Sequence, residues 1–174
     1  MYSGFLIGCF VVFPIISILI ELSVRRRRGE DPDVLGLILR WFTFWIAGVR
    51  LLIDGLTQAI RPEFTAESIF DTTDPTVLPF ISELGYSNIA IGVIGVLSIR
   101  LCSWTAPAAL AGAIFLGLAG IRHLVDGGSF TTDRAVAAGT DIFAVVILIG
   151  ALIAVALRAR RNDAVSSPDR GATP

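Results

Sequence analysis

Seven polar side chains stand within or beside the long apolar stretches of this 174-residue chain: Arg50, Asp54, Glu83, Asn88, His123, Asp126 and Asp141. A charge inside a membrane-spanning segment costs roughly 2.5 to 3.5 kcal/mol on insertion scales, so each one needs a partner or a wet cavity. An imidazole and carboxylates near an arginine are suited to exchanging protons or to holding a polar ligand. These seven residues therefore form a candidate polar pocket.

Helical spacing supports part of this pocket. Arg50 and Asp54 are four residues apart and share a helix face with Thr43 and Ala47, so the two charges can pair. Asn88 shares a face with small residues that allow a neighbouring backbone to approach closely, namely Gly85, Gly92 and Gly95. In a helix that is regular from its start, Glu83 is turned away from Asn88; the alternatives are that Glu83 caps this helix or folds inward from the loop.

Two interpretations of these residues remain open. In the structural one, Arg50 pairs with Asp54 or Asp141 to hold helix register, and Asn88 supplies an interhelical hydrogen bond worth about 1 kcal/mol. In the functional one, His123, Glu83 and Asp141 line a polar pocket near Arg50. A metal site is not expected, because closely spaced His or Cys ligands are missing, and we expect no cofactor, since one histidine cannot supply paired haem ligands.

Known catalytic signatures are missing from the sequence. It contains no phosphate-binding Gly-Lys loop, no nucleophile elbow and no Cys-pair motif. We therefore expect a protein that is not an enzyme.

The elements that must position these residues are membrane helices. The chain is 54% hydrophobic and 17% charged, which is more apolar than soluble domains are. Five apolar stretches approach or exceed the roughly 20 residues that span a bilayer as a helix. They are Met1 to Val24, Val34 to Leu56, Gly85 to Leu101, Pro107 to Leu124 and Ala135 to Leu157. The predicted fold is an all-α integral membrane bundle of five transmembrane helices, a first anchor helix and a four-helix core.

Arginines predict the orientation of this bundle. A tetrad follows the first apolar stretch and further arginines follow the last one: Arg25, Arg26, Arg27, Arg28, Arg158, Arg160 and Arg161. Because basic residues stay in the cytoplasm, the amino terminus is expected outside and the carboxyl terminus inside. This topology places all seven polar residues in the outer half of the membrane.

The predicted organisation has four parts. Residues 1–24 form the anchor helix, 25–33 a basic cytoplasmic loop, 34–158 the four-helix domain and 159–174 a disordered cytoplasmic tail. An outer loop at 57–82 carries a short helix at Pro62 to Phe70, which lies on the membrane surface or forms a lid.

Several motifs resemble an uncharacterised family of small bacterial membrane proteins. They are Glu83-Leu-Gly-Tyr-Ser-Asn88 with Gly92 and Gly95, then Gly120-Ile-Arg-His123, then Ala138-Gly-Thr-Asp141. The resemblance covers about Trp41 to Leu157 and leaves the first helix outside it. It implies a compact four-helix bundle, similar to DoxX-like membrane proteins, with polar residues toward one membrane side, and it implies no activity. A histidine is common in that family where this chain reads Asp54 to Ile60, so a two-histidine site is not implied here.

We therefore expect a multi-pass protein of a bacterial plasma membrane. Its partners are the lipid bilayer and either a membrane protein or a second copy of the chain, with no role for nucleic acid. A non-enzymatic accessory protein or subunit of a membrane complex is favoured, because 174 residues without visible inverted repeats are few for a carrier working alone. The alternative is a small transporter or ligand-binding protein that uses the outward-facing polar pocket.

Overall fold

The computed structural model describes Gly4, residues 7–125 and residues 132–166, and at 132–134 and 163–166 it describes the backbone alone. Within these ranges the chain forms helices and no β-strand, which confirms the all-α prediction. The elements are η1 (Gly8–Val12), α2 (Phe13–Arg27), α3 (Val34–Phe42), η2 (Thr43–Arg50), α4 (Leu51–Ile60), α5 (Pro62–Ser68), η3 (Pro75–Val77), α6 (Leu78–Leu97), η4 (Cys102–Trp104), α7 (Thr105–Val125) and α8 (Thr132–Ser166).

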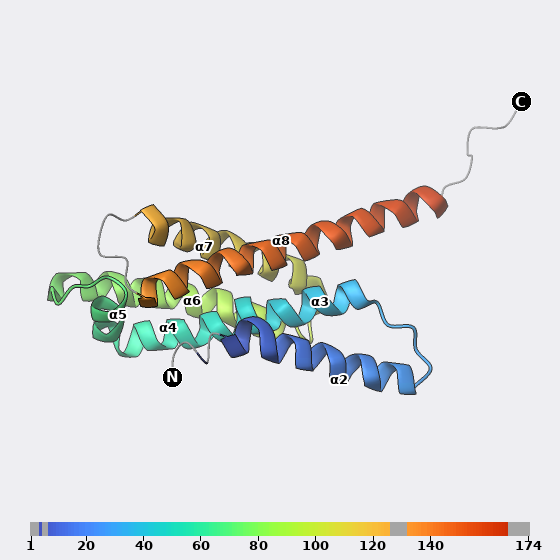
Figure 1. The fold of residues 1–174 in the computed structure, drawn as a ribbon, viewed down its shortest axis with the longest axis horizontal. Helices are drawn as coiled ribbons and strands as arrows, with labels where there is room; N and C mark the ends of the chain where they lie inside the picture. The colour runs from blue at the N-terminus through green and yellow to red at the C-terminus, as the bar shows by residue number, and fades with distance from the viewer. Residues whose placement is uncertain (1–3, 5–6, 126–131, 167–174) are drawn as a thin grey trace, which may run out of the picture.

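Five of the resulting helical spans are long and apolar enough to cross a membrane: Gly8–Arg27, Val34–Ile60, Pro75–Leu97, Cys102–Val125 and Ala135–Asn162. They run side by side as a bundle (Figure 1). The chain is thus a multi-pass membrane protein, as predicted.

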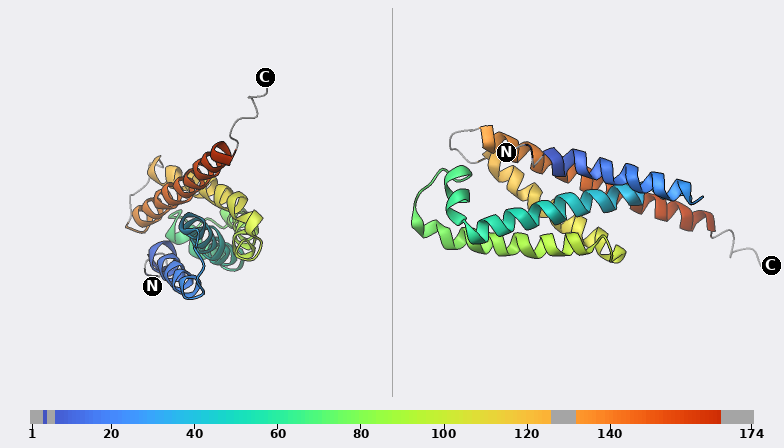
Figure 2. Two further views of the ribbon diagram at one scale, coloured as in Figure 1. Left: turned by 90° about the vertical axis from the view of Figure 1, so that its right-hand side faces the viewer. Right: turned by 90° about the horizontal axis from the view of Figure 1, so that it is seen from below.

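The second span, Val34–Ile60, is the centre of the bundle. It contains α3, the π-helical segment η2 and α4, and it contacts each of the other four spans. Half of the most apolar 18-residue stretch of this span is buried, a larger share than in any other described span. The views along and across the bundle show the other helices arranged around it (Figure 2). Polar groups on this span are therefore enclosed on several sides.

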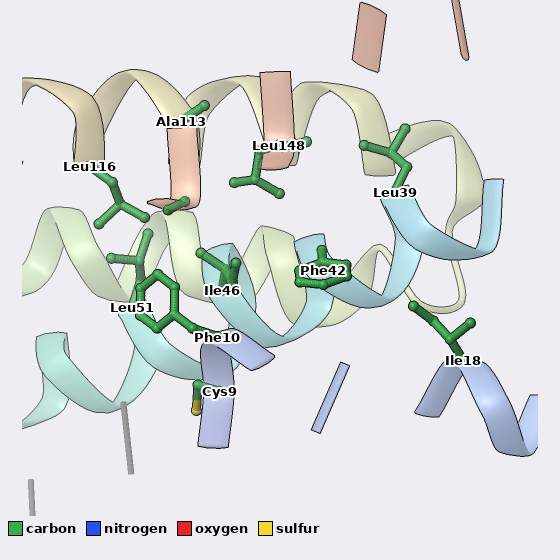
Figure 3. Close-up of a cluster of buried hydrophobic side chains, with 12 residues drawn as sticks. Cys9, Phe10, Ile18, Leu39, Phe42, Ile46, Leu51, Ala113, Leu116 and Leu148 are labelled. Atoms are coloured by element: carbon green, nitrogen blue, oxygen red, sulfur yellow. The ribbon is translucent and has the colours of Figure 1, made fainter. Parts of the chain in front are cut away.

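The apolar core forms around the middle of this central span. Phe42, Ile46 and Leu51 belong to one buried cluster with Leu116 of α7 and Leu148 of α8. Figure 3 shows Phe10 of η1 directed into the same cluster, beside Leu51 and Ile46. The first helix therefore contributes side chains to the core, which the sequence analysis did not predict.

Polar contacts join this first helix to the second. Glu21 accepts hydrogen bonds from Arg25 at 2.8 Å, from the Trp41 indole at 2.8 Å and from the Arg40 guanidinium. Trp45 Nε1 also donates to Ser17 Oγ at 3.1 Å. The Glu21–Arg25 pair has the four-residue spacing that favours ion pairs on one helix, and two donors from α3 turn it into a connection between helices. Such a connection fixes the level of one helix against the other.

Glycines bring α4 and η2 into close contact with α6. A Cβ atom at Gly92 would lie 2.5 Å from the backbone nitrogen of Leu52, and one at Gly95 would lie 2.5 Å from that of Gly48. Such distances are far below van der Waals contact, so any side chain at either position forces the helices apart. This confirms the predicted close approach along the face that carries Asn88.

Two predicted boundaries differ from the structure. Helix α6 begins at Leu78 and not at the predicted Gly85, because Pro79 suits the first turn of a helix and the residues after it continue the helical run. The loop predicted at 57–82 is correspondingly shorter. It contains α5 as predicted, with Thr65 and Ala66 buried where α5 packs against α4 and α6.

The last helix also extends further than predicted. Helix α8 continues to Ser166, through residues 159–166 of the predicted tail. Alanine and arginine are strong helix formers, and residues 159–167 contain no proline, so nothing in this segment stops the helix. Residues 167–174 lie outside the described part of the chain.

Substitutions at glycines test the close α4–α6 contact. Gly92→Ala and Gly95→Ala are each expected to destabilise the protein by about 1 to 3 kcal/mol, because the added methyl group meets backbone atoms of the second span. Thermal unfolding in detergent measures this loss. Gly150→Ala on α8 is the matched control, since a Cβ there meets no atom within 4 Å. Equal unfolding temperatures for Gly92→Ala, Gly95→Ala and the control would contradict the packing.

Candidate functional site

Arg50 is the centre of the candidate site. It is the last residue of η2, and it is 5% exposed although it lies within the central membrane span. Its Nε atom lies 3.0 Å from Asp54 Oδ2, one turn further along the same helix. Its Nη2 atom lies 3.0 Å from Asp141 Oδ1 on α8. The guanidinium therefore bridges two carboxylates on different spans.

These ion pairs offset the free-energy cost of burying charged side chains. An isolated ion loses its hydration in a medium of low dielectric constant, and only close opposite charges and hydrogen bonds compensate for that loss. The Asp141 side chain is 2% exposed and that of Asp54 is 14% exposed. Both carboxylates thus depend on Arg50, and the structure brings together three of the seven predicted residues as one cluster, the Arg50 triad.

Neighbouring residues from two other helices shape this triad. The Phe10 ring of η1 lies with its centroid 5.3 Å from the Arg50 guanidinium carbon, a cation–π distance. Gly120 of α7 faces Asp141, and a Cβ atom at Gly120 would lie 3.0 Å from Asp141 Cβ. The small residue at 120 therefore lets α8 bring its aspartate up to the central span.

Asn88 occupies a separate position on α6. It is 3% exposed, it faces Gly55, and its Nδ2 atom donates to Gln58 Oε1 at 2.8 Å. Within the described part of the chain, Asn88 Oδ1 has no hydrogen-bond partner. Asn88 thus serves as the predicted interhelical hydrogen bond between α6 and α4.

Of the other predicted residues, Glu83 lies apart from this triad. Glu83 is exposed on α6, on a different face from the buried Asn88, because the helix is already regular at this point. His123 is half-buried near the end of α7. Asp126 lies outside the described residues. In the part of the chain that is described, no group of three His, Cys, Asp or Glu side chains is placed to hold a metal ion.

Sequence reasoning missed Gln58 and Phe10. Gln58 lies four residues after Asp54, on the helix stripe that already carried Arg50, so its position was available from the spacing. Phe10 is one of several large apolar residues in the first helix, and its residue type carries no signal for a contact with a buried arginine.

Removing the arginine tests whether the triad stabilises the bundle. Arg50→Met is expected to destabilise the protein by about 3 to 5 kcal/mol, because it leaves two buried carboxylates without their counter-charge. The triple variant Arg50→Met, Asp54→Asn and Asp141→Asn should recover much of this loss. Unfolding in detergent compares these variants, with Arg61→Met at the exposed end of α4 as the control. An Arg50→Met protein as stable as this control would argue against the triad.

Comparison with known proteins places the chain in a family but not in a functional class. No curated protein and no solved structure is similar enough to the chain to count as a match. One family model matches residues 5–164. The match includes the whole first span, Gly8–Arg27, so that helix belongs to the family's domain, in contrast to the resemblance drawn from the motifs, which began near Trp41. Because the model covers most of the chain, the protein belongs to a family of unknown function, DUF6790.

Proposed function

We propose that this protein is a non-enzymatic accessory protein or subunit of a complex in a bacterial plasma membrane. Helix α8 is the observation that carries the proposal. Its 35 residues extend about 52 Å, well beyond a hydrocarbon core of roughly 30 Å. Its span Ala135–Asn162 has the highest mean hydropathy of the described spans, 2.7, and the smallest buried fraction, 17% of its most apolar 18-residue stretch. One side of this helix is left uncovered by the described part of the chain.

The uncovered side of α8 has a regular pattern. Large exposed residues recur at helical intervals of three, seven and four positions: Phe143, Val146, Ile153 and Leu157. Gly139 and Gly150 fall on the same stripe, and each has open space where a side chain would project. Small residues let a second helix approach closely in a membrane, where close packing drives association. This stripe, the α8 face, is suited to a helix of a partner protein or of a second copy.

The polar interior also supports a structural role. The charges of the Arg50 triad contact each other and hold the central span against α8. Asn88 and Gln58 similarly connect α6 with α4. These groups act within the bundle, as expected of a protein that assembles with others and does no chemistry of its own.

Cysteine crosslinking from the α8 face tests the proposal. In a Cys102→Ser background, which removes the exposed native thiol, Val146→Cys is expected to crosslink to a partner or to a second copy in membranes. Leu118→Cys on α7 is the matched control, because Leu118 is 65% exposed and Val146 is 63% exposed. Gel electrophoresis and mass spectrometry identify the products. Equal amounts of crosslinked product from Val146→Cys and Leu118→Cys, together with a monomer in native mass spectrometry, would refute the proposal.

A second candidate function rests on the charges of the triad. Two carboxylates, Asp54 and Asp141, share one guanidinium, which leaves one formal negative charge among these three groups. A buried charge of this kind favours binding of a proton. His123 lies about one helical turn beyond Gly120, the α7 residue that faces Asp141, and it is a further titratable group near the depth of the triad. This supports the alternative of a small transporter or ligand-binding protein, with the proton as its ligand.

Infrared spectroscopy tests the bound proton. The wild-type protein is expected to show the C=O stretching band of a protonated buried carboxyl at neutral pH. Asp54→Asn and Asp141→Asn should each remove it, because the remaining carboxylate then matches the single positive charge of Arg50. Glu83→Gln, which changes an exposed carboxylate, should leave the band in place. A wild-type spectrum without the band would rule out this candidate.

A further inference from the structure

Exposed arginines gather at one end of the bundle. The end of α2, the start of α3 and the C-terminal part of α8 lie toward the same end of the molecule (Figures 1 and 2). Five arginines at this end are exposed: Arg26, Arg27, Arg28, Arg160 and Arg161. We call them the arginine rim. These arginines come from separate helices, so they form one surface only if they lie at one depth along the bundle.

Two ion pairs set that depth. Glu21 of α2 contacts Arg40 of α3, which places these two residues at one level. Arg28 comes seven residues after Glu21, and Asp33 comes seven residues before Arg40 on the antiparallel α3, so both lie about 10 Å further toward the end. Asp33 then accepts a hydrogen bond from Arg158 of α8 at 2.5 Å. The arginines of α2 and α8 therefore lie in one layer.

Nearby carboxylates leave the rim uncompensated. Glu21 is occupied by Arg25 and Arg40, Glu30 lies 3.7 Å from Arg25, and Asp33 is occupied by Arg158. None of the five rim arginines forms an ion pair with any described residue. Glu21, Glu30 and Asp33 thus contact arginines outside the rim, and Asp31 forms no ion pair with a rim arginine within the described residues. The rim therefore keeps a net positive charge.

We propose that the arginine rim binds the phosphate headgroups of anionic phospholipids. The rim lies about 10 Å beyond Arg40 and Trp41, a charged residue beside an indole that is typical of the boundary between hydrocarbon and headgroups. Clusters of four to eight basic residues next to membrane helices attract anionic lipids, and guanidinium groups bind phosphate through paired hydrogen bonds. The positive-inside rule depends only on how many basic residues a loop contains. The rim has a further property, because its arginines come from separate helices and lie at one depth.

The tryptophans supply a direct test. Trp41, Trp45 and Trp104 all lie in the half of the bundle that carries the rim, and they report on lipids there by fluorescence quenching. The full-length protein is reconstituted in brominated phosphatidylcholine, and unbrominated phosphatidylglycerol with the same chain length is added. If phosphatidylglycerol binds at the rim, the tryptophan fluorescence recovers more than is expected from the mole fraction of phosphatidylglycerol in the bilayer. Its relative binding constant over phosphatidylcholine is expected to be on the order of tenfold.

Matched variants decide the outcome. Changing Arg26, Arg27, Arg28, Arg160 and Arg161 to glutamine should bring the relative constant close to one, whereas the same five changes to lysine should keep a preference, because lysine retains the charge. Arg61→Gln at the other end of the bundle should have no effect. Circular dichroism confirms that each variant is folded. Equal binding of both lipids by the wild-type protein would overturn the proposal, as would displacement of phosphatidylglycerol by soluble glycerol phosphate, which indicates a site for free phosphate.

Discussion

The low dielectric constant of a membrane interior makes one guanidinium the point on which this bundle depends. Arg50 cannot be hydrated where it lies, so the fold must bring carboxylates to it from its own helix and from α8. These contacts fix both the rotation and the depth of α8 against the central span. Apolar side chains alone would allow helices in lipid to slide or rotate at little cost, because lipid is as apolar as they are.

Close backbone packing provides the second constraint. Gly48 and Gly55 of the central span meet Gly95 and Gly85 of α6, and no side chain separates the two backbones. Packing of this kind supplies the dispersion contacts that replace the hydrophobic effect inside a membrane. It also orients Asn88 toward α4, where Gln58 is its partner. The two constraints are complementary, since the ionic one connects the central span to α8 and the steric one connects it to α6.

Sequence patterns predicted the interactions that are local along one helix. The five spans, the pairing of Arg50 with Asp54 and the pairing of Glu21 with Arg25 all follow from hydropathy or from four-residue spacing. Contacts between helices were harder to predict, because the relative rotation of two distant helices is not encoded in either one alone. Asp141 was therefore one of two candidate partners for Arg50, and the donors that Arg40 and Trp41 supply to Glu21 were missed. Nor does the sequence carry a recognisable signal for the π-helical turns of η2.

Helix α8 has no break between the buried triad and its projecting end. Asp141 and Arg158 lie about 26 Å apart along one continuous helix. Such a helix behaves as a stiff rod, so a rotation or a shift at the Arg50 contact is carried to the turns that extend beyond the other helices. Any molecule bound to those turns is then mechanically coupled to the protein interior, without a hinge or a linker between them.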